Sequence, residues 1–171
     1  MVIEIMEGDW ILKKILSILF LILILVGCSN DATQESSVKD LTNSTLPPTV
    51  QFEIVDTVYS TEQGSFCWRN SNSANCLSLP SPIEIVEDKN PIKVSNQEKM
   101  KLLVQRQPSH QTLTITSADT HQSEELEINK NNQFKAPDIE GIYILSYYAI
   151  WEKDDSGTSG DSSFIFKIEV K

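Results

Sequence analysis

The fold is clearest in GIYILSYYAIW, residues 141–151 of this 171-residue chain. Isoleucine, tyrosine and tryptophan are residue types that favour strands. A second run, residues 163–170, places its two phenylalanines, Ile168 and Val170 on one face. The polar, glycine-containing residues 152–162 separate the two runs. The pattern predicts a long antiparallel hairpin at the end of the chain.

Shorter runs of alternating polarity lie upstream, separated by turn residues. Thr49–Ser60 alternates along its length, and the β-branched Thr112–Thr116 alternates most cleanly. Further short extended segments are predicted at Gly64–Arg69, Ile83–Val86, Pro91–Val94, Met100–Val104 and Glu124–Ile128. No stretch of ten or more residues has the apolar spacing of an amphipathic helix. The chain is therefore predicted to be all-β, an antiparallel two-sheet sandwich.

Aromatic side chains fall on both faces of residues 141–151. Tyr143, Tyr147 and Trp151 share one parity, whereas Tyr148 has the other. One face is expected to belong to the core. The other face is either covered as well or forms an exposed aromatic strip of the kind that binds sugars or protein partners.

The start of this run, Gly141-Ile142-Tyr143, resembles the tyrosine corner of immunoglobulin-like domains. In that corner a tyrosine at the entry of a late strand bonds back to upstream backbone. The resemblance implies an immunoglobulin-like sandwich. Ile139 stands where such corners usually carry aspartate, and no cysteine follows two residues after Tyr143. An antibody-type domain is therefore not expected.

The beginning of the chain has the pattern of a secretory leader. Lys13 and Lys14 precede the uncharged apolar run Ile15–Val26, which is too short for a comfortable membrane span. Gly27 and Cys28 then follow. The end of this leader resembles a bacterial lipobox, which implies cleavage before Cys28 and a diacylglyceryl group, with palmitate-like chains, on its thiol. An uncleaved anchor, or a plain secretory signal with an incidental cysteine, is the alternative.

Three segments follow from this pattern. Residues 1–27 are predicted to be a lipoprotein signal peptide, and residues 28–48 a lipidated N-terminus with a disordered, polar linker. Residues 49–171 are predicted to form the β-sandwich domain. A flexible linker of this length spans roughly 25 Å on average, so it would hold the domain near a membrane without pressing it onto the surface.

The chain as a whole resembles small lipoproteins of Gram-positive bacteria, in which a lipobox and a polar tether precede a β-rich domain. The resemblance depends on the lipobox, on the run Gly64–Trp68, and on an ending that contains Gly141, Tyr143, Trp151, Phe164, Phe166 and Val170. It implies location at the extracytoplasmic face of the cell membrane. It implies no activity.

The formal net charge is −10 at pH 7. Residues 1–27 contain two lysines and three acidic residues, so the processed chain would carry −9. Nucleic-acid binding needs a basic patch, and a polybasic contact with a membrane surface needs a lysine cluster. The composition argues against both.

Cys67 and Cys76 remain as a pair once Cys28 is assigned to the lipid. An oxidising compartment permits a disulfide between them, with free thiols as the alternative. A zinc site would need four ligands at recognisable spacing, and none is present.

No residue set points to catalysis, a cofactor or a metal. His110 and His121 lie in polar sequence, and the chain has no Gly-x-Ser-x-Gly motif. The acidic residues 152–161 do not follow EF-hand spacing, so a solvated loop is a better interpretation than a calcium site. We therefore expect no catalytic, cofactor-binding or metal-binding residues.

The resulting hypothesis is a lipid-anchored, extracytoplasmic, non-catalytic binding or adapter module. Its partners would be the membrane, through the lipid, and an unidentified envelope protein or polymer. One alternative is an accessory subunit or inhibitor of an envelope enzyme, which would use an exposed rigid loop such as Asn70–Asn75. A small hydrolase, with a site assembled from serine, His110 and aspartate, is the other alternative.

Overall fold

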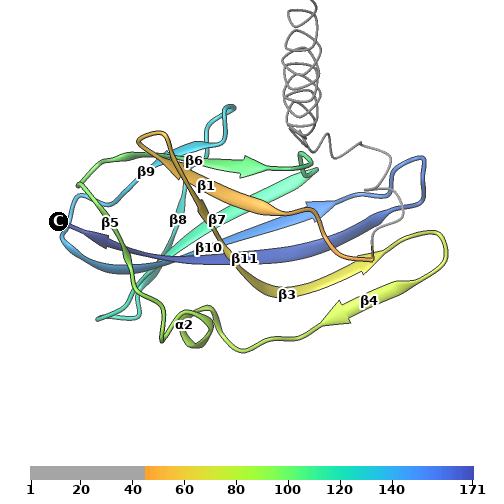
Figure 1. The fold of residues 1–171 in the computed structure, drawn as a ribbon, viewed down its shortest axis with the longest axis horizontal. Helices are drawn as coiled ribbons and strands as arrows, with labels where there is room; N and C mark the ends of the chain where they lie inside the picture. The colour runs from red at the N-terminus through yellow and green to blue at the C-terminus, as the bar shows by residue number, and fades with distance from the viewer. Residues whose placement is uncertain (1–44) are drawn as a thin grey trace, which may run out of the picture. The chain divides into compact units, whose positions relative to one another are not determined.

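The computed structural model describes residues 45–171, which form a two-sheet β-sandwich (Figure 1). The leader, Cys28 and most of the predicted linker lie outside the described residues. The elements are β1 (Val50–Ile54), β2 (Thr57–Ser60), β3 (Glu62–Arg69), β4 (Ala74–Leu77), α2 (Pro82–Ile85), β5 (Ile92–Val94), β6 (Lys99–Val104), β7 (His110–Ser117), β8 (Ser123–Leu126), β9 (Gln133–Lys135), β10 (Gly141–Trp151) and β11 (Ser159–Val170). The all-β prediction is confirmed.

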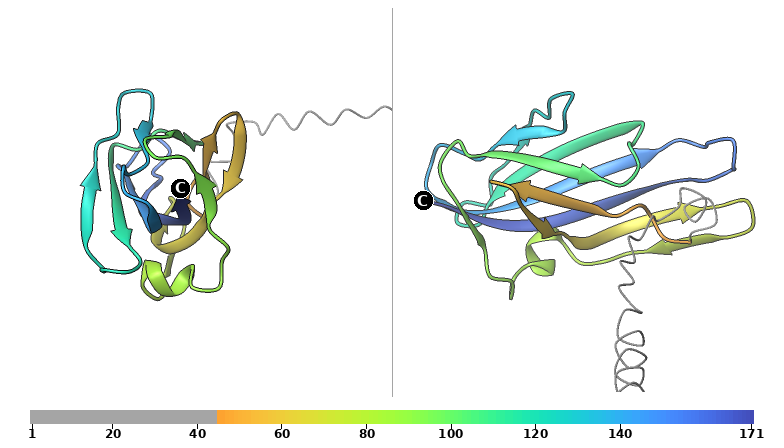
Figure 2. Two further views of the ribbon diagram at one scale, coloured as in Figure 1. Left: turned by 90° about the vertical axis from the view of Figure 1, so that its left-hand side faces the viewer. Right: turned by 45° about the horizontal axis from the view of Figure 1, so that its top comes forward.

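The strands divide into two sheets. Sheet A has the order β2-β1-β6-β9, and sheet B has the order β4-β3-β11-β10-β7-β8. These neighbours pair antiparallel, and β5 adds to sheet B by pairing parallel with the end of β11. The end-on view in Figure 2 shows the strands around a common centre, with α2 outside them.

The predicted terminal hairpin is the centre of sheet B. β10 and β11 pair over the whole of β10, from Gly141 opposite Val170 to Trp151 opposite Gly160. β11 begins at Ser159, four residues earlier than the sequence pattern indicated. Gly160 permits this extension, because a Cβ there would collide with the carbonyl of Cys67 and the ring of Trp68.

Side chains from both sheets fill the core. Phe52 of sheet A stacks on Phe166 of sheet B, with ring centroids 4.1 Å apart. Trp68 and Trp151 meet edge to face at 5.5 Å. Tyr147 is fully buried, and its hydroxyl donates to Gln111 Oε1 at 2.6 Å. Burial raises the pKa of Tyr147 well above its ordinary value.

The expectation of one strand over Thr49–Ser60 is wrong, because this segment is a hairpin. Val55 and Asp56 have positive φ angles, and the chain reverses there between β1 and β2. Val58 therefore lies on an edge strand and is 49% exposed, although it shares the parity of the buried Phe52. The alternation of polar and apolar residues cannot reveal a turn when the apolar residues keep the same even-numbered positions before and after it.

Ile83–Val86 is also corrected, from an extended segment to the short helix α2. Ser81 and Glu84 form a capping box: the Ser81 hydroxyl accepts from the Glu84 N–H, and the Glu84 carboxylate accepts from the Ser81 N–H. The Ser81 side-chain hydrogen bond is the main cause that lowers the pKa of Glu84. The helix leads to Val86, which packs on Ile144 and Ile165 of sheet B.

The first described residues belong to the packed domain. Pro47 and Pro48 are buried, directly before β1. The carbonyl of Thr45 accepts a hydrogen bond from the Asn75 side chain at 3.2 Å. The chain therefore meets the domain beside the β3–β4 hairpin.

Candidate binding groove

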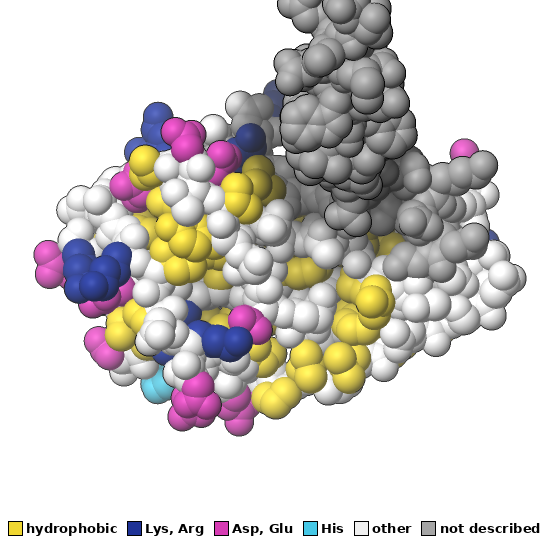
Figure 3. Space-filling view, viewed as in Figure 1, with side chains coloured by type: hydrophobic (Ala, Val, Ile, Leu, Met, Phe, Trp, Pro, Cys, Tyr) yellow, Lys and Arg dark blue, Asp and Glu magenta, His cyan; other side chains and the backbone are white. Residues whose placement is uncertain are grey.

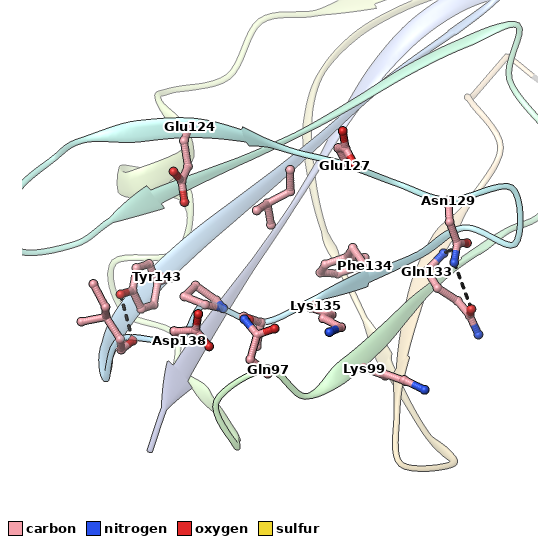
Figure 4. Close-up of a pocket in the computed structure, with 14 residues that line it drawn as sticks. Gln97, Lys99, Glu124, Glu127, Asn129, Gln133, Phe134, Lys135, Asp138 and Tyr143 are labelled. Atoms are coloured by element: carbon pink, nitrogen blue, oxygen red, sulfur yellow. Dashed lines mark hydrogen bonds between the residues drawn. The ribbon is translucent and has the colours of Figure 1, made fainter.

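An open groove runs between the edge strands of the two sheets. β8 is the last strand of sheet B and β9 is the last strand of sheet A, and the groove between them has a volume of about 610 Å³ (Figure 4). Ligand pockets commonly lie in the range of about 300–1,000 Å³. The lining residues include Leu126, Glu127 and the 133–139 segment. We call this site the β8–β9 groove.

The connection from β8 to β9 closes one end of the groove. Asn129 organises this turn, because its Oδ1 accepts from the main-chain N–H groups of Asn131 and Gln133 at 2.8 and 3.0 Å. Asn129 Nδ2 also donates to the Gln133 side chain at 3.2 Å, as Figure 4 shows. Asn132 adopts a positive φ of 58° within the turn. Asparagine favours such turns because its side chain can bond to nearby backbone.

The other end of the groove is set by the tyrosine corner that the sequence predicted. The Tyr143 hydroxyl donates to the Ile139 carbonyl at 3.0 Å, which is the expected bond back to upstream backbone. Ile139 itself is 74% exposed. A second hollow of about 540 Å³ begins on the far side and shares Glu124, Ile139 and Tyr143 with the first.

The groove is lined by charges of both signs over an apolar floor. Glu124 points into the groove from β8, whereas the Glu127 carboxylate points away from it (Figure 4). Lys99 and Lys135 lie on the β6–β9 side, where Asp138 also lines the groove beyond Lys135. Phe134 is buried at the floor. Within residues 45–171 no ion pair joins these charged side chains to each other or to a further residue.

The groove lies far along the sandwich from the point where the chain enters it. Tyr143 is opposite Ile168, near the C-terminal end of the β10–β11 pair. Asn75, which holds Thr45, lies opposite Trp68, and Trp68 lies opposite Gly160 at the other end of that pair. On the face in Figure 3, charged side chains gather at the end that carries the C-terminus. Residues 70–82, around β4, contain no charged residue.

The structure brings the two predicted cysteines together. Cys67 and Cys76 are direct cross-strand partners in β3 and β4, in a disulfide-compatible arrangement. Cys67 alternates with the buried Phe66 and Trp68, so the pair lies on the outer face of sheet B. Cys28, the predicted lipid site, lies outside the described residues.

The two histidines are not brought together. His110 begins β7, not a loop, and its Nε2 lies 3.3 Å from Glu152 Oε1 at an exposed position. His121 lies in the β7–β8 turn with a positive φ. A hydrolase site built around His110 therefore has no buried pocket in the described part of the chain.

The acidic loop after β10 has a structural role. Asp154 Oδ1 accepts from Ser156 and from the Thr158 N–H, and Asp154 Oδ2 pairs with Arg106 at 2.9 Å. The Ser156 hydroxyl is the largest of the causes that lower the pKa of Asp154. Across residues 45–171 no group of three or more potential metal ligands occurs.

The outer face of β10 does not carry an aromatic strip. Tyr148 is 41% exposed, but Ile144, further along the same face, is buried under the Val86 segment. The neighbours of Tyr148 across the sheet are Thr112 and Ser163. Of the two possibilities left open by the sequence, neither holds fully, because part of this face is covered and Tyr148 is the one aromatic side chain that β10 places on it.

Sequence reasoning missed the groove. Its walls come from β8, β9 and β6, which adjoin only after the chain crosses between the sheets. The acidic residues of β8 are adjacent in the sequence and could be noticed there. That Lys99 and Lys135 lie opposite each other follows only from the pairing of β6 with β9.

Comparison with protein-family models and with curated proteins gave no match to this sequence. No helix among the described residues is long and apolar enough to cross a membrane. The fold and the groove thus define the class of this domain: a two-sheet β-sandwich with a ligand-sized opening between two edge strands.

Proposed function

We propose that this protein is a lipid-anchored extracytoplasmic binding module and that the β8–β9 groove is its ligand site. The proposed anchor is a diacylglyceryl group on Cys28, supported by the lysines, the short apolar run and the small residue that precede it. Two acyl chains hold a protein to a bilayer durably, whereas one chain does not.

The position of the groove is the main support for this proposal. It opens at the side of the sandwich between β8 and β9, away from the β3–β4 hairpin where Thr45 enters. A tethered domain would therefore keep this opening accessible to a second component of the envelope. The apolar floor and the charged walls are the usual components of a site that selects one ligand.

A binding role agrees with the chemistry of the described residues better than catalysis does. His110 is exposed and paired with an exposed glutamate, so no buried nucleophile and base are assembled around it. The groove holds lysine and glutamate side chains but no histidine or cysteine. Its side chains can contribute charge, hydrogen bonds and apolar contact.

The test is retention of the protein on isolated cell envelopes. The wild-type segment, residues 29–171, contains every described strand. It is compared with a double variant, Lys135→Glu with Glu124→Lys, that reverses one charge on each side of the groove. Lys93→Glu with Glu87→Lys is the matched control, because both side chains are exposed and outside the groove. We expect retention by the wild type and the control, and loss in the groove variant. Equal retention by all three would reject the groove as the site.

A further inference from the structure

Lys99 and Lys135 are direct partners in the antiparallel pair β6–β9. Like charges at opposite positions on neighbouring strands are destabilising. Both side chains are exposed, both line the groove, and neither has an ion-pair partner within residues 45–171. An anionic group placed between the two ammonium groups would remove this repulsion.

The facing wall has the complementary feature. Glu124 lies opposite the buried Ile115, so its side chain extends from the inner face of β8 and into the groove. Glu125 lies opposite Thr114 and projects to the outer face. The Glu124 carboxylate has no ion-pair partner among the described residues either. A cationic group on the ligand would provide one.

The two strands that border the groove also carry free main-chain edges. β8 pairs only with β7, and β9 pairs only with β6, in the part of the chain that the structure describes. An extended peptide can satisfy such an edge by adding as a further strand, whereas a sugar polymer lacks the matching array of N–H and C=O groups. Leu126 and Phe134 would contact its apolar side chains.

We propose that the β8–β9 groove binds a short extended peptide that carries both a carboxylate and an ammonium group. The peptide adds to the free edge of β8, its carboxylate lies by Lys99 and Lys135, and its ammonium group lies by Glu124. This inference rests on the proposed function, because it names the ligand class of the same groove. It explains why the two walls are charged but not paired with each other.

The probe is the tetrapeptide Ala-Leu-Val-Ala with free termini, titrated into residues 29–171 and followed by calorimetry and by NMR shifts of Tyr143 and Phe134. Two further probes carry an acetylated N-terminus or an amidated C-terminus. Each exposed charge pair is expected to change affinity by about two- to fivefold. The free peptide should therefore bind more tightly than either blocked form.

Single substitutions in the groove test which protein side chain contacts each end of the peptide. Lys135→Gln should reduce the advantage of the free carboxylate, because Lys99 alone remains beside it, but keep that of the free ammonium group. Glu124→Gln should have the reverse effect, and Lys93→Gln, outside the groove, should change neither. Thermal unfolding of each variant verifies that it is folded.

Two results would overturn the inference. One is that the wild type binds none of the three peptides; the other is that it binds all three equally. If the envelopes still retain the wild type and not the charge-reversed variant, the proposed function stands and only the ligand class is wrong. If retention also fails, the groove is not the ligand site.

Discussion

Lys99 and Lys135 lie directly opposite each other in the β6–β9 pair, on the wall of the β8–β9 groove. A sheet that served stability alone would gain from an opposite charge or a neutral residue at one of these positions. Under the proposed peptide binding, ligand affinity and stability would therefore have different requirements at this pair.

Lys135→Gln is expected to stabilise the domain while it weakens ligand binding. Removal of the like-charge contact should raise the free energy of unfolding by about 0.2–1 kcal/mol at low salt. Urea unfolding at low and at high ionic strength measures the effect, and the gain should shrink with added salt because exposed charges are screened. A loss of stability at low salt would show that the two ammonium groups do not repel each other.

Tyr143→Phe tests the tyrosine corner. The substitution removes the hydrogen bond to Ile139 and keeps the ring in place, so the free energy of unfolding should fall by about 0.5–1.5 kcal/mol. The matched control is Tyr59→Phe, since the Tyr59 hydroxyl makes no hydrogen bond within residues 45–171. Equal effects of the two substitutions would mean that the corner bond adds nothing.

Asp154→Asn should reduce stability in a manner that depends on pH. The Ser156 hydroxyl, the Thr158 and Ser156 N–H groups and Arg106 lower the pKa of Asp154 in the folded state. The stabilisation is therefore present above the unfolded pKa of about 4 and is lost as pH falls through the lower folded pKa. Unfolding curves of both proteins should differ at pH 7 and converge toward pH 2. A constant difference would contradict the assigned cause.

Cys67 and Cys76 are expected to form a disulfide in the oxidised protein. Closure of so short a loop stabilises the folded state by about 2.5–3 kcal/mol in the chain-entropy model. Intact mass after alkylation, with and without prior reduction, counts the free thiols. Urea unfolding of the Cys67→Ala, Cys76→Ala variant measures the stabilisation. Two thiols that alkylate in the native, unreduced protein would exclude the bond.

The sequence alone predicted the strands that have one buried face. Ile168, Val170 and the alternating run of β7 could be recognised because each strand is long and its parity is uniform. The hairpin turn at Val55 and the capped helix at Pro82 were missed. Both are short features, specified by backbone conformation and by one side-chain hydrogen bond pattern, so they leave little trace in hydrophobic periodicity.

The candidate site was less accessible to sequence reasoning than the fold. Tyr143 could be assigned to a corner from three neighbouring residues, but Lys99 and Lys135 are far apart in sequence and meet only through strand register. Register between strands that are not consecutive depends on the whole topology. A groove formed by two edges is therefore visible only in the folded structure.

We propose that this sandwich acts while it is held at the cell exterior by lipid on Cys28. Intact-mass measurement of the full-length protein, isolated from membranes of its native host, tests for this lipid. We predict a chain that begins at Cys28 and is heavier than its sequence by a diacylglyceryl group, and we predict that Cys28→Ala abolishes this mass increase. An unprocessed amino terminus with a free Cys28 thiol would exclude the lipid anchor.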